Sequence, residues 1–320
     1  MRRLTFTVSV LVSALFLTNP APAFSQKLRP VTVGMTGRTI ASLPFEMSIG
    51  RGHFKQAGLD VKLITINQSD VIIKATMTNE LTFMSIIPTA ILASVRGLPV
   101  RTIAVNLENA PYVLVGRPQI KSMSDMKGKK VAVSSLGSMS TYVVREIVAR
   151  NGLDPERDLT VLAVGGSGAR AASLAAGFVD AALVTAPMNY DLERQGFTRL
   201  AWGPDFVRYP LNGVAGSTDF LAANRELVLA FLRGVAGGVR DVKQRKAEMI
   251  PFVKEYLKIP EEEAVKSYEF LVANMSDNLE TDDATILKAM QFAGNALKLK
   301  PEAMPDITKV RDWSFARALK

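Results

Sequence analysis

Lys129-Lys-Val-Ala-Val-Ser-Ser-Leu-Gly-Ser-Met-Ser-Thr-Tyr142 is the stretch of this sequence that decides its fold. The residues around Val131 have the apolar spacing of a strand, and a turn follows over 135–137. Ser138 can then cap a helix that carries Tyr142. A helix N-terminus leaves backbone N–H groups unpaired and carries partial positive charge, so it can receive an anion. Many such joints only connect a strand to a helix, and both interpretations stay open here.

The order of elements along the chain occurs twice. The first copy comprises Gly58-Leu-Asp60, a strand at 61–66, a helix at 71–77, Asn79-Glu-Leu-Thr-Phe83 and Pro88. The second copy comprises Gly152-Leu-Asp154, a strand at 159–164, a turn, a helix, Gly177-Phe-Val-Asp-Ala181 and Pro187. Strands that alternate with helices predict α/β layers around a largely parallel sheet. The repeat predicts two lobes rather than one large sheet.

Two extended segments can carry the chain between these lobes. Residues 112–116 lead outward and residues 209–214 return, and Gly116 and Gly213 would absorb the backbone rotation of a hinge. The mature chain then divides into a first lobe of 26–115 plus 215–320 and a second lobe of 116–214. Early in the first lobe, Pro44 opens a helix that we expect to run from Phe45 to Gln56.

Beyond residue 217 the sequence becomes helical. Leu227, Phe231 and Val235 lie on one stripe of an amphipathic helix, and the charges on its other face exclude a membrane span. Further helices are expected over 247–257, 261–273, 282–297 and 309–319, with prolines between them.

The first residues have the features of a secretory leader. Arg2 and Arg3 precede a run without charge from Leu4 to Leu17, and small-x-small motifs follow, so cleavage is expected after Ala23 or Ser25. This run is shorter than the roughly 20 residues that a membrane-spanning helix needs. We therefore expect residues 1–25 to be removed and the mature protein to work in the periplasm.

Composition sets several function classes aside. The net charge of +9 falls to about +7 without the leader and is spread without a basic block, which argues against nucleic-acid binding. The absence of cysteine excludes disulfides, a thiolate nucleophile and a lipidated cysteine. The single histidine, His53, lacks the partners of a catalytic relay or a histidine metal site and is interpreted as a surface residue. We predict no catalytic residue, no metal and no cofactor.

A glycine-rich segment follows the strand at 159–164. Gly166-Ser-Gly-Ala-Arg-Ala171 formally meets the G-x-G-x-x-A pattern of dinucleotide sites. Such a site also needs an acidic residue at the end of the next strand, whereas Asp180 comes at the beginning of its strand. The pattern therefore favours a close backbone turn beside a ligand, with N–H groups of Ser167 and Gly168 available to it.

Four segments together resemble a known family: His53–Val61, Ile120–Val131, Gly137-Ser138 and Ala172–Ala181. In order and spacing over about 31–216 they are similar to ABC-transporter substrate-binding proteins of the nitrate, sulfonate and taurine type, a group that includes binders of thiamine-pyrimidine precursors. The sequence departs from that pattern where Asn79–Phe83 lacks an aspartate and where His53 replaces a tyrosine.

The resemblance implies the type II periplasmic-binding-protein fold, with two α/β lobes joined by two hinge strands and a helical C-terminal region. It also implies a monomer that holds a solute in the cleft and docks transiently on a membrane permease. The ligand contacts that it implies lie at strand ends and crossings, where open α/β sheets place ligands. They are Thr36, Arg38, Leu43, Ser69, Ser85, Ile86, Ser135, Gly137, Ser138, Met139, Thr185 and Asn212.

Arg38 is the preferred counter-charge for an anionic ligand and Arg170 the second, the alternative for each being an arginine that faces solvent. The predicted function is capture of a small anionic organic solute, such as a sulfonate or carboxylate, or of nitrate, for an ABC importer. The alternatives are a thiamine-pyrimidine-precursor binder, a synthase-like enzyme of the same fold, and a periplasmic sensor-input protein. The leader and the lone His53 argue against the enzyme.

Overall fold

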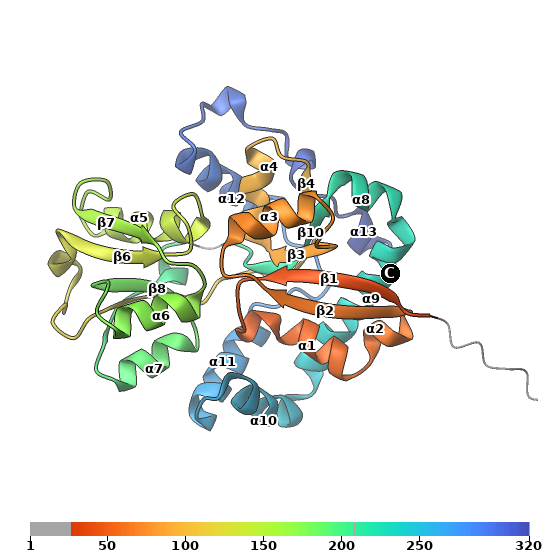
Figure 1. Ribbon diagram of the computed structural model, residues 1–320, viewed down its shortest axis with the longest axis horizontal. Coiled ribbons are helices and arrows are strands. Elements are labelled where there is room, and N and C mark those ends of the chain that lie inside the picture. The colour runs from red at the N-terminus through yellow and green to blue at the C-terminus, as the bar shows by residue number, and fades with distance from the viewer. Residues whose placement is uncertain (1–26, 208, 320) are drawn as a thin grey trace, which may run out of the picture.

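The computed structural model describes residues 27–207 and 209–319, which form two lobes, each around its own five-stranded sheet (Figure 1). The first sheet has the order β2-β1-β3-β10-β4 and comprises β1 (Arg29–Met35), β2 (Leu59–Thr65), β3 (Phe83–Ile86), β4 (Val100–Leu107) and β10 (Asn212–Ser217). The second has the order β7-β6-β8-β5-β9 and comprises β5 (Tyr112–Gly116), β6 (Lys129–Val133), β7 (Leu159–Ala163), β8 (Ala181–Thr185) and β9 (Thr198–Trp202). The predicted leader lies outside the described residues.

Both sheets are mixed because each receives one strand from a chain that arrives from the other lobe. Strands β1, β2 and β3 pair in parallel, as do β6, β7 and β8, and this matches the expected parallel pattern. Strands β10 and β5 run antiparallel to their neighbours. Each therefore begins at the edge where the parallel strands end.

The predicted crossings were placed too late in the chain. Residues 112–116 are β5, which pairs with β8 and β9 inside the second sheet, and residues 212–214 are already part of β10. The chain changes lobe over 108–111 and again between β9 and β10, where the short 3-10 helix Gly203–Asp205 lies. An extended apolar segment has the same sequence pattern whether it connects two sheets or joins one, so the pattern alone did not separate these cases.

The helices of the first half follow the predicted order with one break. In the first lobe they are α1 (Leu43–Gly50), α2 (His53–Gln56), α3 (Ser69–Met77) and α4 (Ile87–Val95), and in the second α5 (Met139–Arg150), α6 (Ser167–Ala175) and α7 (Met188–Arg194). The single helix expected over 45–56 is wrong. Gly52 has φ of 75°, a left-handed conformation that ends α1 and separates it from α2.

The C-terminal part is helical, as predicted, and packs mainly on the first lobe. It comprises α8 (Thr218–Ala223), α9 (Arg225–Gln244), α10 (Lys246–Leu257), α11 (Glu261–Ala273), α12 (Asp283–Ala296) and α13 (Ser314–Arg317). The helix expected over 309–319 is the short α13, preceded by a 3-10 turn at Ile307–Lys309. None of the helices in 27–207 and 209–319 combines the length and apolar composition needed to cross a bilayer.

Helix α9 forms the centre of the first lobe's core. Phe231 stacks on Phe83 with ring centroids 4.5 Å apart and on Phe54 at 5.1 Å. On the same helix, a Cβ at Gly238 would lie 2.0 Å from the Pro44 carbonyl oxygen, so only glycine lets α1 approach this closely.

His53, predicted to lie on the surface, is instead partly buried between α2 and α9. Its Nε2 lies 2.6 Å from Asp241 Oδ2, and its side chain is 21% exposed. Burial raises the pKa of Asp241, but hydrogen bonds from His53 and Arg245 outweigh this and leave the pKa below its usual value. Because the members of this pair lie 188 residues apart, no local pattern indicates it.

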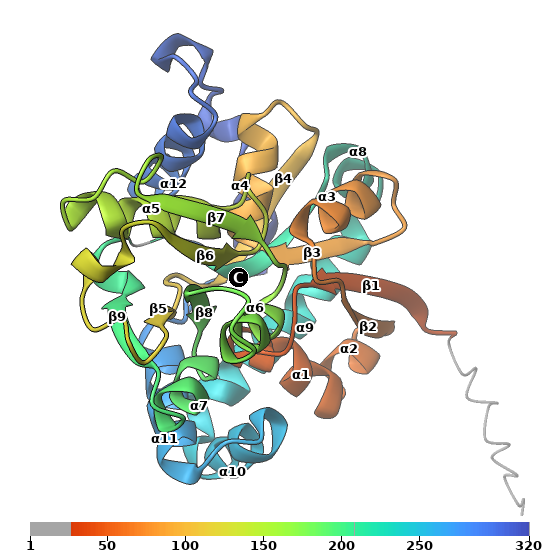
Figure 2. The same cartoon turned by 60° about the vertical axis from the view of Figure 1, so that its left-hand side comes forward.

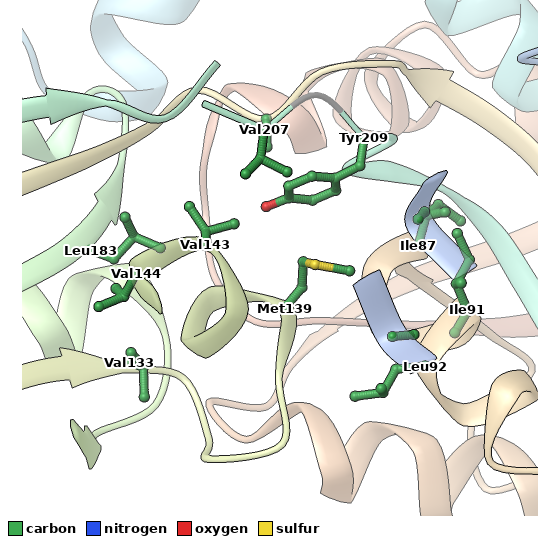
Figure 3. Close-up of a cluster of buried hydrophobic side chains, with 14 of the residues drawn as sticks. Ile87, Ile91, Leu92, Val133, Met139, Val143, Val144, Leu183, Val207 and Tyr209 are labelled. Atoms are coloured by element: carbon green, nitrogen blue, oxygen red, sulfur yellow. The ribbon is translucent and has the colours of Figure 1, made fainter. Parts of the chain in front are cut away.

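The two lobes pack against each other beside the cleft. An apolar cluster continues from α4 of the first lobe to α5 of the second, as Figure 3 shows, and helix α12 lies beside both α4 and α5 (Figure 2). The labelled members are Ile87, Ile91, Leu92, Val133, Met139, Val143, Val144, Leu183, Val207 and Tyr209. On α5, Tyr142 stacks on Phe292 of α12 with ring centroids 4.7 Å apart. Arg194 of α7 also pairs with Glu263 of α11.

Candidate ligand-binding site between the lobes

A pocket of about 290 Å³ lies where the strand ends of the two sheets face each other. Its first-lobe wall includes Thr36 and Arg38 after β1, Ser85 at the end of β3 and Asn212 at the start of β10. Its second-lobe wall is formed by the start of α6, the end of β8 and Tyr112 at the start of β5. Pockets for small ligands usually hold roughly 300–1,000 Å³, so this one suits a small solute.

The start of α6 brings backbone N–H groups into the pocket. Ser167, Gly168 and Ala169 line it, and the first turn of a helix has no intrahelical acceptors for such groups. Gly166 lies so close to the first lobe that a Cβ there would be 2.5 Å from the Thr36 carbonyl oxygen. The glycine-rich segment therefore serves as a close backbone turn, and the lobes touch across the cleft at this point.

Arg170 is the buried cation of this site. Only 3% of its surface is exposed, its Nη2 donates to Ser167 Oγ at 2.8 Å, and its Nε and Nη1 have no hydrogen-bond partner. Ser167 Oγ also accepts from the Thr185 backbone N–H at 2.9 Å, which fixes the serine against β8. No described residue forms an ion pair with Arg170. A buried guanidinium without an acidic partner is costly unless an anion balances its charge.

Two tyrosines, one at each crossing between the lobes, act on this guanidinium. Tyr112 follows the first crossing, Tyr209 lies in the second, and their ring centroids are 6.2 Å apart. Burial lowers the pKa of Arg170, while the charges of both tyrosines and the nearby hydroxyl of Tyr112 act to raise it. Burial also raises the pKa of Tyr209 well above its ordinary value, so its hydroxyl stays neutral.

A smaller chamber of about 30 Å³ lies beyond Arg170. It shares Thr36, Ile86, Tyr112, Gly166 and Arg170 with the main pocket, and its own lining adds Ser69, Pro88, Thr89, Ser134, Ser138, Met139 and Ser140. A volume of this size is enough for about one water molecule with several hydrogen-bond partners. The chamber therefore suits a bridging water better than a solute.

Arg38 occupies a different position, at the exposed side of the pocket. Its guanidinium carbon lies 5.4 Å from the centroid of the Tyr256 ring of α10. The Tyr256 hydroxyl donates to Glu46 Oε1 at 2.9 Å and lies 3.0 Å from Ser42 Oγ, so the ring is held in place. No Asp or Glu occurs among the described residues that line either chamber.

Most of the residues implied by the resemblance lie around these two chambers. Thr36, Arg38, Ser85, Ile86, Thr185 and Asn212 line the main pocket, and Ser69, Ser138 and Met139 line the smaller chamber. Whether they contact a ligand stays a prediction. Asn212 is 8% exposed and its Oδ1 has no hydrogen-bond partner, so it also has an acceptor to offer.

The structure does not bring three of the implied residues to either chamber. Leu43 is fully buried in the core of the first lobe. Gly137 faces Arg96 of the first lobe, whose Nη2 would lie 2.5 Å from an added Cβ. The Ser135 carbonyl accepts from Ser138 Oγ and Thr141 Oγ1, each at 2.7 Å.

The expected cap at Ser138 also needs correction. Ser138 is the N-cap residue of α5, but its side chain donates back to the Ser135 carbonyl, lies 2.7 Å from Ser140 Oγ, and accepts no hydrogen bond from a backbone N–H of the helix. The turn after β6 therefore uses this hydroxyl to close itself. Ligand contact through the Gly137-Ser138 backbone, expected from sequence, has less support here than contact through α6.

Sequence reasoning missed Tyr112 and Asn67 as pocket residues and ranked Arg170 below Arg38. Tyr112 stood in a segment interpreted as a crossing, and its position directly after that crossing is the signal that could have placed it at the cleft. For Arg170, the glycine-rich start of its helix was the signal, but its burial depends on packing that one sequence does not show.

Residues 41–248 match the protein family described as NMT1/THI5 like, and the chain belongs to this family. The chain is 25% identical over 231 residues to the riboflavin-binding protein RibY of Chloroflexus aurantiacus, which covers 69% of this chain and 65% of that protein. The match to the family over residues 41–248 confirms the family resemblance inferred from the sequence.

Solved structures show the same fold. The alkanesulfonate-binding protein SsuA of Xanthomonas axonopodis pv. citri, bound to MOPS, has a TM-score of 0.72 at 16% identity, covering 89% of this chain and 99% of that one. The periplasmic nitrate-binding protein NrtA of Synechocystis PCC 6803 also has a TM-score of 0.72 at 16% identity, covering 92% and 88%. The desulfurization enzyme DSZB shares the fold with a TM-score of 0.62 at 13% identity, covering 91% and 98%. The predicted fold of two α/β lobes with a helical C-terminal region is confirmed.

Proposed function

We propose that this protein is the periplasmic solute-binding component of an ABC importer and captures a small organic anion between its lobes. The observation that carries the proposal is Arg170, a buried cation that lines the pocket and has no acidic partner among the described residues. Family membership and the names of the relatives support a binding role, and the pocket volume favours a small solute over a large one. The bound protein would then dock on a membrane permease.

A calorimetric and thermal-shift screen tests this proposal. The panel contains methanesulfonate, taurine, short carboxylates, nitrate, a thiamine-precursor pyrimidine and riboflavin. At 100 times its dissociation constant a true ligand stabilises the folded protein by about 2.7 kcal/mol. The proposal requires that at least one organic anion binds and that the Arg170→Met variant loses this binding. Binding of only pyrimidine or riboflavin by both proteins would contradict it.

The alternative of an enzyme receives no support from the side chains around the pocket. His53 lies on α2 and bonds to Asp241, away from both chambers, and the chain has no cysteine. A protein that passes a signal to a receptor would bind a solute between its lobes in the same way. A gene neighbourhood with a receptor gene in place of permease and ATPase genes would favour this sensor-input role.

A further inference from the structure

The pocket holds two arginines at different depths. Arg170 is 3% exposed and lines both chambers, whereas Arg38 is exposed and lines only the main pocket. Neither forms an ion pair with a described residue, and the described lining contributes no carboxylate. One pocket therefore presents two positive charges, and a single anionic group would neutralise only one of them.

The outer charge is held in place rather than free in solvent. The guanidinium of Arg38 lies over the Tyr256 ring, and Glu46 and Ser42 fix the hydroxyl of that ring. Glu46 does not line the pocket and forms no ion pair with Arg38. A cation held by an aromatic face loses less side-chain freedom when it meets a ligand, and its charge remains available.

The inner charge is enclosed by the protein. Nη2 of Arg170 donates to Ser167, and Nε and Nη1 are buried without a hydrogen-bond partner, so an anion beside this side chain would balance a charge that the protein leaves unpaired. The N–H groups at the start of α6 lie in the same wall and add positive potential there. An acidic group at one end of a solute would sit here, and the rest of the solute would extend through the main pocket.

We propose that this pocket selects solutes with two anionic groups, one held at Arg170 and the other at Arg38, such as a small dicarboxylate or a sulfonated carboxylate. This inference rests on the proposed function and names its substrate class. The family resemblance does not require it, because one anionic group is enough for a sulfonate or nitrate site. Tyr256 acts as a positioning residue that holds Arg38.

Matched pairs of ligands test this inference at pH 7.5 and constant ionic strength. The dianions are succinate, glutarate, adipate and sulfoacetate, and their monoanionic partners are butyrate, pentanoate, hexanoate and methanesulfonate. In the wild type we expect at least one dianion to bind about ten-fold tighter than its partner, the factor that one additional charge-assisted hydrogen bond supplies. In Arg38→Met that preference should fall to about two-fold while the monoanion keeps its affinity. In Arg170→Met, dianions and monoanions should both bind more weakly.

The control is Arg233→Met, which removes an exposed arginine of α9 that forms no ion pair with a described residue and lies outside the pocket lining. It should leave every dissociation constant unchanged. Tyr256→Leu should reduce the dianion preference without affecting monoanions. Monoanions that bind as tightly as dianions, or a preference that survives Arg38→Met, would overturn the inference and leave the proposed function standing. Failure of every organic anion to bind would overturn both.

Discussion

Replacing Arg170 by methionine should strengthen the ligand-free fold and weaken the site at the same time. Methionine is unbranched and apolar, so it can fill most of the space without introducing charge. Ser167 Oγ keeps its hydrogen bonds to Thr185, at 2.9 Å to the backbone nitrogen and 2.9 Å to Oγ1. The substitution therefore leaves the serine hydroxyl with hydrogen-bond partners. Because Nε and Nη1 have no partner, the guanidinium costs stability when no ligand is present.

The two effects have different magnitudes. Two hydrogen bonds from a charged group to an anion would contribute roughly 1.5–3 kcal/mol each, and desolvation of the anion offsets part of this. We therefore expect a loss of about 3 kcal/mol in binding, a factor of roughly 100 in Kd. Removal of an unpaired buried charge should raise the free energy of unfolding by about 1 kcal/mol, which is a melting temperature about 2 °C higher for a chain of this size.

The assay combines thermal unfolding without ligand and calorimetry with the tightest-binding anion of the panel. Arg233→Met again serves as the control, with both quantities unchanged. A melting temperature several degrees below that of the wild type, together with an unchanged Kd, would show that Arg170 supports the fold rather than the ligand. That result would refute the reasoning from its unpaired nitrogens.

Two more predictions follow from contacts in the structure. Gly166→Ala should weaken ligand binding about ten-fold or more, because a Cβ would lie 2.5 Å from the Thr36 carbonyl oxygen and hold the lobes apart. Gly50→Ala, at the end of α1 and outside the pocket lining, where an added Cβ meets nothing within 4 Å, should bind normally. X-ray scattering should show Gly166→Ala more open with ligand, and equal scattering would contradict this. Asp241 has a lowered pKa, so its contribution to stability is present above its usual value of 3.8 and is lost as the pH falls through the lowered value. Urea unfolding should show Asp241→Asn less stable than the wild type at pH 7, and this difference in the free energy of unfolding should shrink as the pH falls below 3.8. A difference that stays the same over that range would disprove the role of the pair with His53.

Local patterns were sufficient for most of the secondary structure. The repeat starting at Gly58 and at Gly152 corresponds to left-handed glycines with φ of 76° and 82°, each followed by an equivalent strand. Asn79 and Gly177, which occupy matching places in the repeat, also share positive φ, at 61° and 78°. Turn residues and apolar periods act over a few neighbours, so one sequence contains enough information to place them.

The site was predicted only to the level of strand ends. The pattern indicates which loops face the cleft because parallel strands end at one edge, but it does not give the direction of each side chain. Leu43, the first residue of α1, points into the core, and Gly137, in the turn before α5, packs against Arg96, although both follow strands at the expected edge. The sequence does not show whether Arg38 or Arg170 is the main counter-charge, because it does not give the direction of either side chain.

The sequence by itself determined two α/β lobes, a helical C-terminal region and the family to which the chain belongs. Only the tertiary structure decided where the chain changes lobe, that Arg170 is buried without an acidic partner, and that Arg38, whose guanidinium lies over the Tyr256 ring, shares its pocket. The first set depends on short-range propensity and periodicity. The second depends on contacts between residues far apart in the chain, where burial and charge balance are properties of the packed molecule and of no single segment.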